Sequence, residues 1–124
     1  MTEDGNAAIA VLGAAVVTFL VVMGLADIGI FFIARAGAQT AADAAALAAA
    51  SELIPGGGQD PERQARRFAT ANGARLVKCA CRPGAQAAEV KVEAAARFLL
   101  FSSGKQVPAV ARAEVNLAGL QGPP

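Results

Sequence analysis

The hydrophobic pattern divides the chain into two unlike parts. Residues 7–26 are twenty consecutive uncharged positions, mostly Ala, Val, Leu and Ile, and the apolar run continues to Ala34 with Asp27 as its interruption. A helix of twenty residues is about 30 Å long, which matches the hydrocarbon thickness of a bilayer. The run lacks the polar face of a soluble amphipathic helix. It therefore predicts a transmembrane helix over residues 7–34, behind a short leader-like segment, residues 1–6.

A cleaved secretory signal is the rival interpretation of this segment. The apolar part of such a signal is about 7–15 residues long and follows a basic start. Here the apolar run is longer, and the chain begins Met-Thr-Glu-Asp-Gly. The Ala-x-Ala pattern at residues 36–38 leaves a cut before Gln39 open. Arg35 is the single nearby basic residue, and the positive-inside rule alone would place its flank in the cytoplasm.

Residues 35–54 continue the helix as an alanine-rich extension. Arg35, Gln39 and Asp43 recur at every fourth position and form one polar stripe, while most of the remaining surface is alanine. Small side chains allow another helix to approach closely. We therefore expect this segment either to stack against other helices or to act as a stiff stalk. A Pro-Gly-Gly-Gly-Gln sequence then predicts a linker at residues 55–59.

Residues 60–120 are predicted to form a small extracytoplasmic α+β domain, followed by a tail at residues 121–124. Its first element is a helix that begins with Asp-Pro at position 60 and ends at Asn-Gly near position 73. Phe68 is its expected anchor in the core. A domain of this size has a thin core, so we expect packing against residues 35–54, or against neighbouring subunits, to supply the missing burial.

Three strands are expected after this helix. They are residues 76–81, 89–94 and 107–117, and strict alternation in the last two gives each one apolar face and one polar face. Short turns favour an antiparallel sheet. The cluster Phe98-Leu-Leu-Phe101 is expected in the core, with a membrane-touching or partner-facing patch as the alternatives.

Composition and charge exclude several functions. The chain has no His, Trp or Tyr, which counts against Ser/His and Cys/His catalysis and against most zinc sites. The net charge of +1 gives little support for nucleic-acid binding, although residues 1–54 carry −4 and residues 55–124 carry +5. No phosphate-binding loop, dinucleotide motif or paired-carboxylate site is present. We therefore expect no enzyme activity, no cofactor, no metal and no small-molecule substrate.

Cys79 and Cys81 form the one redox-like pattern. On a regular strand, residues two apart have Cα atoms about 6.5–7 Å apart, at the edge of disulfide geometry. A bridge between them therefore requires a bend in the backbone. Burial as small apolar side chains is the main interpretation, a disulfide within the chain or between subunits is the second, and a catalytic thiol is the third.

Asp27 interrupts the apolar run. A carboxylate near the centre of a bilayer costs up to about 3 kcal/mol. Either the membrane ends at this residue, or the side chain finds a partner on another helix. Arg35 is too far along the helix axis, roughly 12 Å, to pair with it. Our hypothesis is that Asp27 sets the register between subunits or with an assembly protein.

Three stretches resemble a known family. They are Gln39–Ala50 directly after the transmembrane segment, Gly5–Ala10 at a glycine-to-apolar junction, and Ala71–Cys79 before a valine-alternating strand. Together they are similar to the TadE/TadG-like proteins of Flp and tight-adherence (Tad) pilus and secretion systems, of the small actinobacterial type.

The resemblance implies a type IV pseudopilin-like membrane protein inserted with its N-terminus inward. It also implies processing between Gly5 and Asn6 by a prepilin peptidase. The expected partners are the lipid bilayer and either pilus or secretion assembly proteins or other pseudopilin-like subunits. The alternative is a stalk-anchored binding module, in which the basic residues 55–124 recognise an anionic surface ligand.

Overall fold

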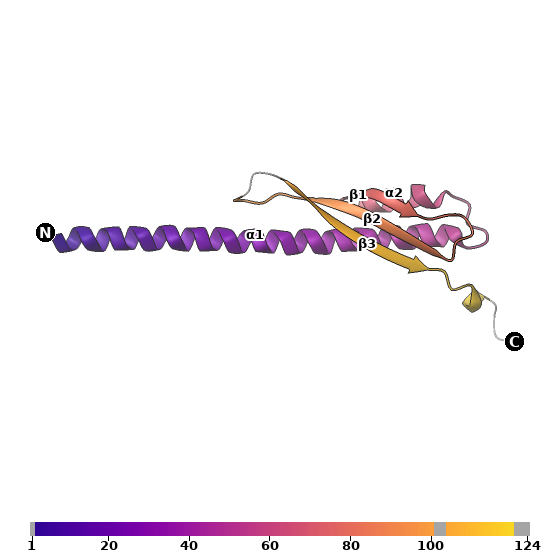
Figure 1. The fold of residues 1–124 in the computed structure, drawn as a ribbon, viewed down its shortest axis with the longest axis horizontal. Coiled ribbons are helices and arrows are strands. Elements are labelled where there is room, and N and C mark those ends of the chain that lie inside the picture. The colour runs from indigo at the N-terminus through magenta and orange to yellow at the C-terminus, as the bar shows by residue number, and fades with distance from the viewer. Residues whose placement is uncertain (1, 101–103, 121–124) are drawn as a thin grey trace.

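The computed structural model of the chain describes residues 2–100 and 104–120. A long helix α1 (Thr2–Leu53) is followed by a shorter helix α2 (Pro61–Ala71). Three strands and a short 3-10 helix complete the chain, namely β1 (Ala74–Ala80), β2 (Ala87–Ala96), β3 (Lys105–Glu114) and η1 (Leu117–Leu120). Figure 1 shows the sheet lying along the C-terminal half of α1, with the N-terminal half projecting alone. The predicted α+β architecture is confirmed. The predicted tail, residues 121–124, lies outside the described residues.

Helix α1 runs without a break from its apolar half into its alanine-rich half. No proline interrupts residues 2–53, and alanine and leucine favour the helical state. Among the described residues it is the one helix long and apolar enough to cross a membrane, and its most apolar stretch buries no residue inside the protein. A core helix of a soluble protein would be mostly buried. The part of α1 from Glu3 to Val22 is therefore largely apolar and lacks cover from the described chain.

The linker after α1 turns sharply. Gly56 has φ +98°, a conformation that side chains disfavour, and the Gly57 amide donates a hydrogen bond to the Ile54 carbonyl oxygen at 2.9 Å. A Cβ atom on Gly57 would collide with the backbone of Glu52. The chain can therefore fold α2 back beside α1 only because glycine occupies these two positions.

Helix α2 begins at Pro61 as expected and ends before Gly73, which has φ +75°. Its buried face consists of Pro61, Gln64, Ala65 and Ala69. The expectation for Phe68 was wrong, because this side chain is 44% exposed. Helices α1 and α2 contact each other, and fully buried alanines on both leave little space between them for a phenyl ring.

The sheet is antiparallel with the order β1-β2-β3. Alternation in β2 is as predicted, with Val90 and Val92 fully buried. The expectation for Leu117 was wrong, because β3 ends at Glu114 and Leu117 lies in η1 with 40% of its surface exposed. The inner face of the sheet consists of Ala74, Leu76, Ala88, Val90, Val92, Ala96, Val107, Ala109 and Ala111. Its polar face carries the cross-strand ion pair between Arg75 and Glu93 at 2.8 Å.

The alanine face of α1 forms the other half of the core. This face contacts β2, β3 and α2, and its buried residues are Ala38, Ala41, Ala42, Ala45, Ala46, Ala49, Ala50 and Leu53. Alanine therefore allows the chain's own sheet to approach the helix axis closely. The stripe of Arg35, Gln39 and Asp43 remains exposed, and Gln39 Nε2 donates to the Asp43 carboxylate at 3.0 Å. The predicted packing of the domain against residues 35–54 is present.

We predict that Ala45→Leu destabilises the domain by about 1–3 kcal/mol, because extra methyl groups overpack a closed interface. Ala45 is fully buried, whereas Ala36 on the same helix is exposed. The matched variant Ala36→Leu should therefore change stability by no more than about 0.5 kcal/mol. Urea-dependent proteolysis of the full chain in detergent micelles measures both values. Equal stability of the two variants would contradict the packing described.

Candidate functional site

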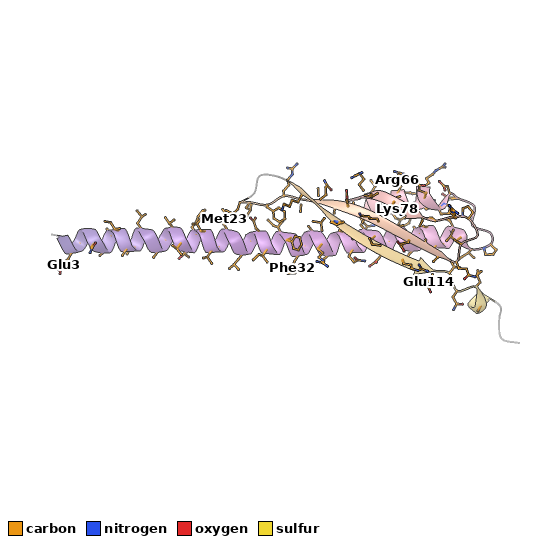
Figure 2. The ribbon with its side chains drawn as sticks, viewed as in Figure 1. Glu3, Met23, Phe32, Arg66, Lys78 and Glu114 are labelled. Atoms are coloured by element: carbon orange, nitrogen blue, oxygen red, sulfur yellow. A yellow bond between two sulfur atoms is a disulfide. The ribbon has the colours of Figure 1, made fainter. Side chains whose placement is uncertain are left out.

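Leu99 and Leu100, the described residues at the tip of the β2–β3 hairpin, meet α1 at Asp27. The carboxylate accepts hydrogen bonds from two consecutive backbone amides, from Leu99 to Oδ1 at 2.6 Å and from Leu100 to Oδ2 at 3.1 Å. Asp27 is 8% exposed although it lies in the apolar half of the chain. Figure 2 shows the coloured segment that follows β2 lying above the stretch of α1 between the labelled Met23 and Phe32. The site therefore joins two segments that are far apart in sequence.

The local structure explains why these amides need a partner. The last ladder pair of the hairpin is Ala96 with Lys105, so the described residues between them lie outside the sheet. Buried amides without a partner cost free energy. A carboxylate provides two strong acceptors, and hydrogen bonds to charged groups contribute about 1.5–3 kcal/mol. The single acid of the apolar run thus satisfies backbone groups of a loop that has no strand partner.

This arrangement differs from both alternatives considered for Asp27 from the sequence. The backbone of its own chain donates to both carboxylate oxygens, a partner that neither alternative included. Where the membrane ends relative to Asp27 stays a prediction. A contact between subunits at Asp27 stays a prediction. The pairing was missed because the two segments are 72 residues apart. One signal for it was present in the sequence, namely an isolated acid in one apolar segment and an isolated apolar cluster in the other.

Two adjoining cavities surround this contact. The larger has a volume of about 520 Å³ and the smaller about 290 Å³, and they share Phe31, Phe98 and Lys105. The larger is lined by Gly24, Asp27, Ile28, Phe31, Phe32, Phe98, Leu100 and Lys105. Arg35 lines the smaller one. The walls are mainly apolar with cations at the edge, which suits an amphiphilic ligand rather than a polar substrate.

The described side chains of the Phe-Leu-Leu-Phe cluster differ in how far they are buried. Phe98 is half-buried and packs against the core, whereas Leu99 is 60% exposed and Leu100 is 46% exposed. Phe101 lies outside the described residues. The core expectation therefore holds for Phe98 and is wrong for Leu99 and Leu100.

The structure joins Cys79 and Cys81 in a disulfide. A bulge at Val77 shifts the register of β1 by one residue and turns Cys79 toward the core side. The chain then bends into the turn at Arg82, and the two Cα atoms are 5.4 Å apart. The bend that the sequence required for a bridge is therefore present. Among the described residues, no group of three or more His, Cys, Asp or Glu could hold a metal ion.

The proposed processing junction lies at the N-terminal end of α1. Gly5 and Asn6 are both exposed there, next to Glu3 and Asp4. The structure leaves their processing as a prediction.

Residues 5–52 match the family model described as "Putative Flp pilus-assembly TadE/G-like". The match covers nearly all of α1 and stops before the linker, so α2 and the sheet lie outside it. The resemblance predicted from the sequence is confirmed over this segment, and it supports a role associated with Tad pilus assembly. No curated protein and no solved structure matches the chain.

We predict that Asp27→Ala releases the hairpin tip from α1. The amides of Leu99 and Leu100 lose their acceptors, so their hydrogen exchange should accelerate by roughly tenfold to a hundredfold, as expected for the loss of about 1.5–3 kcal/mol. Exchange is measured on the full chain in micelles. Asp43→Ala is the control, because Asp43 is exposed and accepts only from Gln39 among the described side chains. Unchanged exchange at the tip in Asp27→Ala would show that the contact does not hold the loop.

We predict that Cys79 and Cys81 resist alkylation until the protein is reduced. Their Cα separation falls within the range of disulfides, about 4.4–6.8 Å. Mass spectrometry of the full chain, purified without reductant, should show no alkyl groups before reduction and two after it. Labelling of both thiols in the unreduced protein would contradict the bridge.

Proposed function

We propose that this protein is a pseudopilin-like structural or assembly component of a Tad-type pilus or secretion system. A single transmembrane helix, the apolar half of α1, anchors it in the cell membrane. The N-terminus faces inward and the α+β domain lies outside. The TadE/G-like match supports this role because it covers the helix that would be stored in the bilayer and packed against other subunits.

The exposed apolar half of α1 is the observation that carries the proposal. Its large side chains are open to the surroundings on all sides of the helix, including Leu12 at 67%, Phe19 at 60% and Leu25 at 64%. A continuous apolar surface of this size marks a membrane or protein contact. Lipid or like helices would cover it, and both environments fit a subunit that is held in a membrane before assembly.

The fold also supports a retained anchor. Ala38, which precedes the conceivable cut before Gln39, is fully buried under the sheet. A cut at that point would divide α1 within its packed half and would remove Asp27 from the hairpin tip. Retention of the helix keeps both contacts.

The proposed role is positional rather than catalytic. The helix places the subunit, and the domain presents a polar sheet face to partners. On that face Arg75 forms an ion pair with Glu93, and Arg112 Nε lies 3.3 Å from Oε1 of Glu114. This pairing reduces the free positive charge on which the rival interpretation, a module for an anionic surface ligand, depends.

Cysteine scanning over residues 9–25 of α1 tests the proposal in native membranes. Both native cysteines are replaced by serine in the parent variant. If subunits pack through α1, oxidative crosslinking should peak at every third or fourth position, as for one helix face. Uniformly absent crosslinks at every position would contradict packing through this helix.

The mass and N-terminal residue of the protein purified from its own membranes test the anchor separately. Met1 indicates an uncleaved anchor and Asn6 indicates pilin-type processing; either supports the proposal. Gln39 at the N-terminus would overturn it, because the anchor would then be lost.

A further inference from the structure

We propose that the tip of the β2–β3 hairpin is a second membrane contact. Leu99 and Leu100 insert into the same bilayer that α1 crosses, and Lys105 and Arg35 bind the head groups of anionic phospholipids beside it. This inference rests on the membrane placement of α1 and is independent of its role in assembly.

The depth of Asp27 along α1 gives the first support. Asp4 and Arg35 lie at the two ends of the apolar run, and the helix rises about 46 Å between them, which is close to the full thickness of a bilayer with its head groups. Asp27 lies roughly 12 Å closer to the bilayer centre than Arg35. A loop bonded to Asp27 therefore lies at the outer edge of the hydrocarbon.

The hydrogen bonds of the tip suit that depth. A loop can enter a bilayer only where its backbone polar groups are satisfied within the protein. The amides of Leu99 and Leu100 bond to the Asp27 carboxylate instead of to water. The same bonds explain how a carboxylate persists beside lipid, since its oxygens are occupied and the residue is almost fully covered.

Exposed apolar side chains extend from the helix onto the tip. On α1 they include Ile28 at 55%, Phe32 at 63% and Ile33 at 75%, and on the loop Leu99 and Leu100. Phe32 and Leu100 both line the 520 Å³ cavity. This apolar surface is continuous with the predicted membrane span. Lipid acyl chains that surround the span would therefore also cover this surface.

Cations border this surface on the side away from the N-terminus. Lys105 lines both cavities and Arg35 lines the smaller one. Arg97, at the start of the loop, is also exposed. Among the described residues none of the three forms an ion pair, and the one acid lining the cavities is Asp27. Long basic side chains reach from an apolar surface to head groups, so the charge here matches anionic phospholipid.

Tryptophan fluorescence tests the contact because the chain contains no Trp and no Tyr. The full chain carrying Leu100→Trp is placed in nanodiscs whose phospholipids are brominated near the head-group end of the acyl chains. We expect blue-shifted emission and strong quenching. Leu117→Trp is the matched control, since Leu117 is similarly exposed at 40% but lies at the far end of the domain; its emission should stay red-shifted and unquenched.

Two further variants separate the possible failures. The emission of Leu12→Trp, which lies within the span, should be blue-shifted whether or not the second contact exists. Red-shifted emission from this variant would overturn the membrane placement of α1 itself. If Leu12→Trp is blue-shifted while Leu100→Trp and Leu99→Trp remain red-shifted and unquenched, the second contact is refuted and the anchor stands.

The head-group part has its own test. Quenching of Leu100→Trp should be stronger in nanodiscs with anionic phosphatidylglycerol than in purely zwitterionic ones. Adding Lys105→Glu should abolish that difference. If the Leu100→Trp variant that retains Lys105 is quenched equally in both lipids, the proposed role of the cations is wrong.

Discussion

The burial of the alanine face of α1 beneath the chain's own sheet is the contact on which the rest of the structure depends. Alanines such as Ala42 and Ala45 are fully buried, so the sheet lies directly against the helix that continues into the apolar half. Because α1 has no break, the direction of its apolar half fixes the direction of the domain (Figure 1). Without α1, the residues after the linker would lack half of their core, so the domain and the apolar half of α1 form one connected unit.

Asp27 adds a second point of attachment nearer to the N-terminal end of α1. The hairpin extends beyond the packed sheet and reaches back along α1, where the carboxylate holds the amides of Leu99 and Leu100. The single acid of the apolar run thus accepts hydrogen bonds from the backbone of its own chain, so that it is not left unpaired among apolar residues. The two contacts hold the domain against α1 at two separate places, which suits the proposed role of a subunit that is placed and stacked.

Local sequence patterns were sufficient to predict the long helix, the limits of α2 and the buried face of β2. The uncharged run gave the long helix, the Asp-Pro and Asn-Gly pairs gave the limits of α2, and alternation gave the buried valines of β2. Long-range packing decided the rest. Phe68 stays partly outside because α1 presents alanines to α2, and the bulge at Val77 depends on the register of the neighbouring strand. The Asp27 contact joins residues 72 positions apart, and no periodicity within either segment encodes that distance.

A distance measurement between the apolar half of α1 and the sheet tests the rigid connection most directly. Spin labels are attached at Leu20→Cys and Glu114→Cys, with serine at both native cysteine positions. The distance between the two labels is measured by electron paramagnetic resonance in nanodiscs. If α1 continues unbroken from its apolar half into the core, one narrow distance distribution is expected. A broad or multiple distribution would show that the domain moves independently of its anchor and would contradict the central claim.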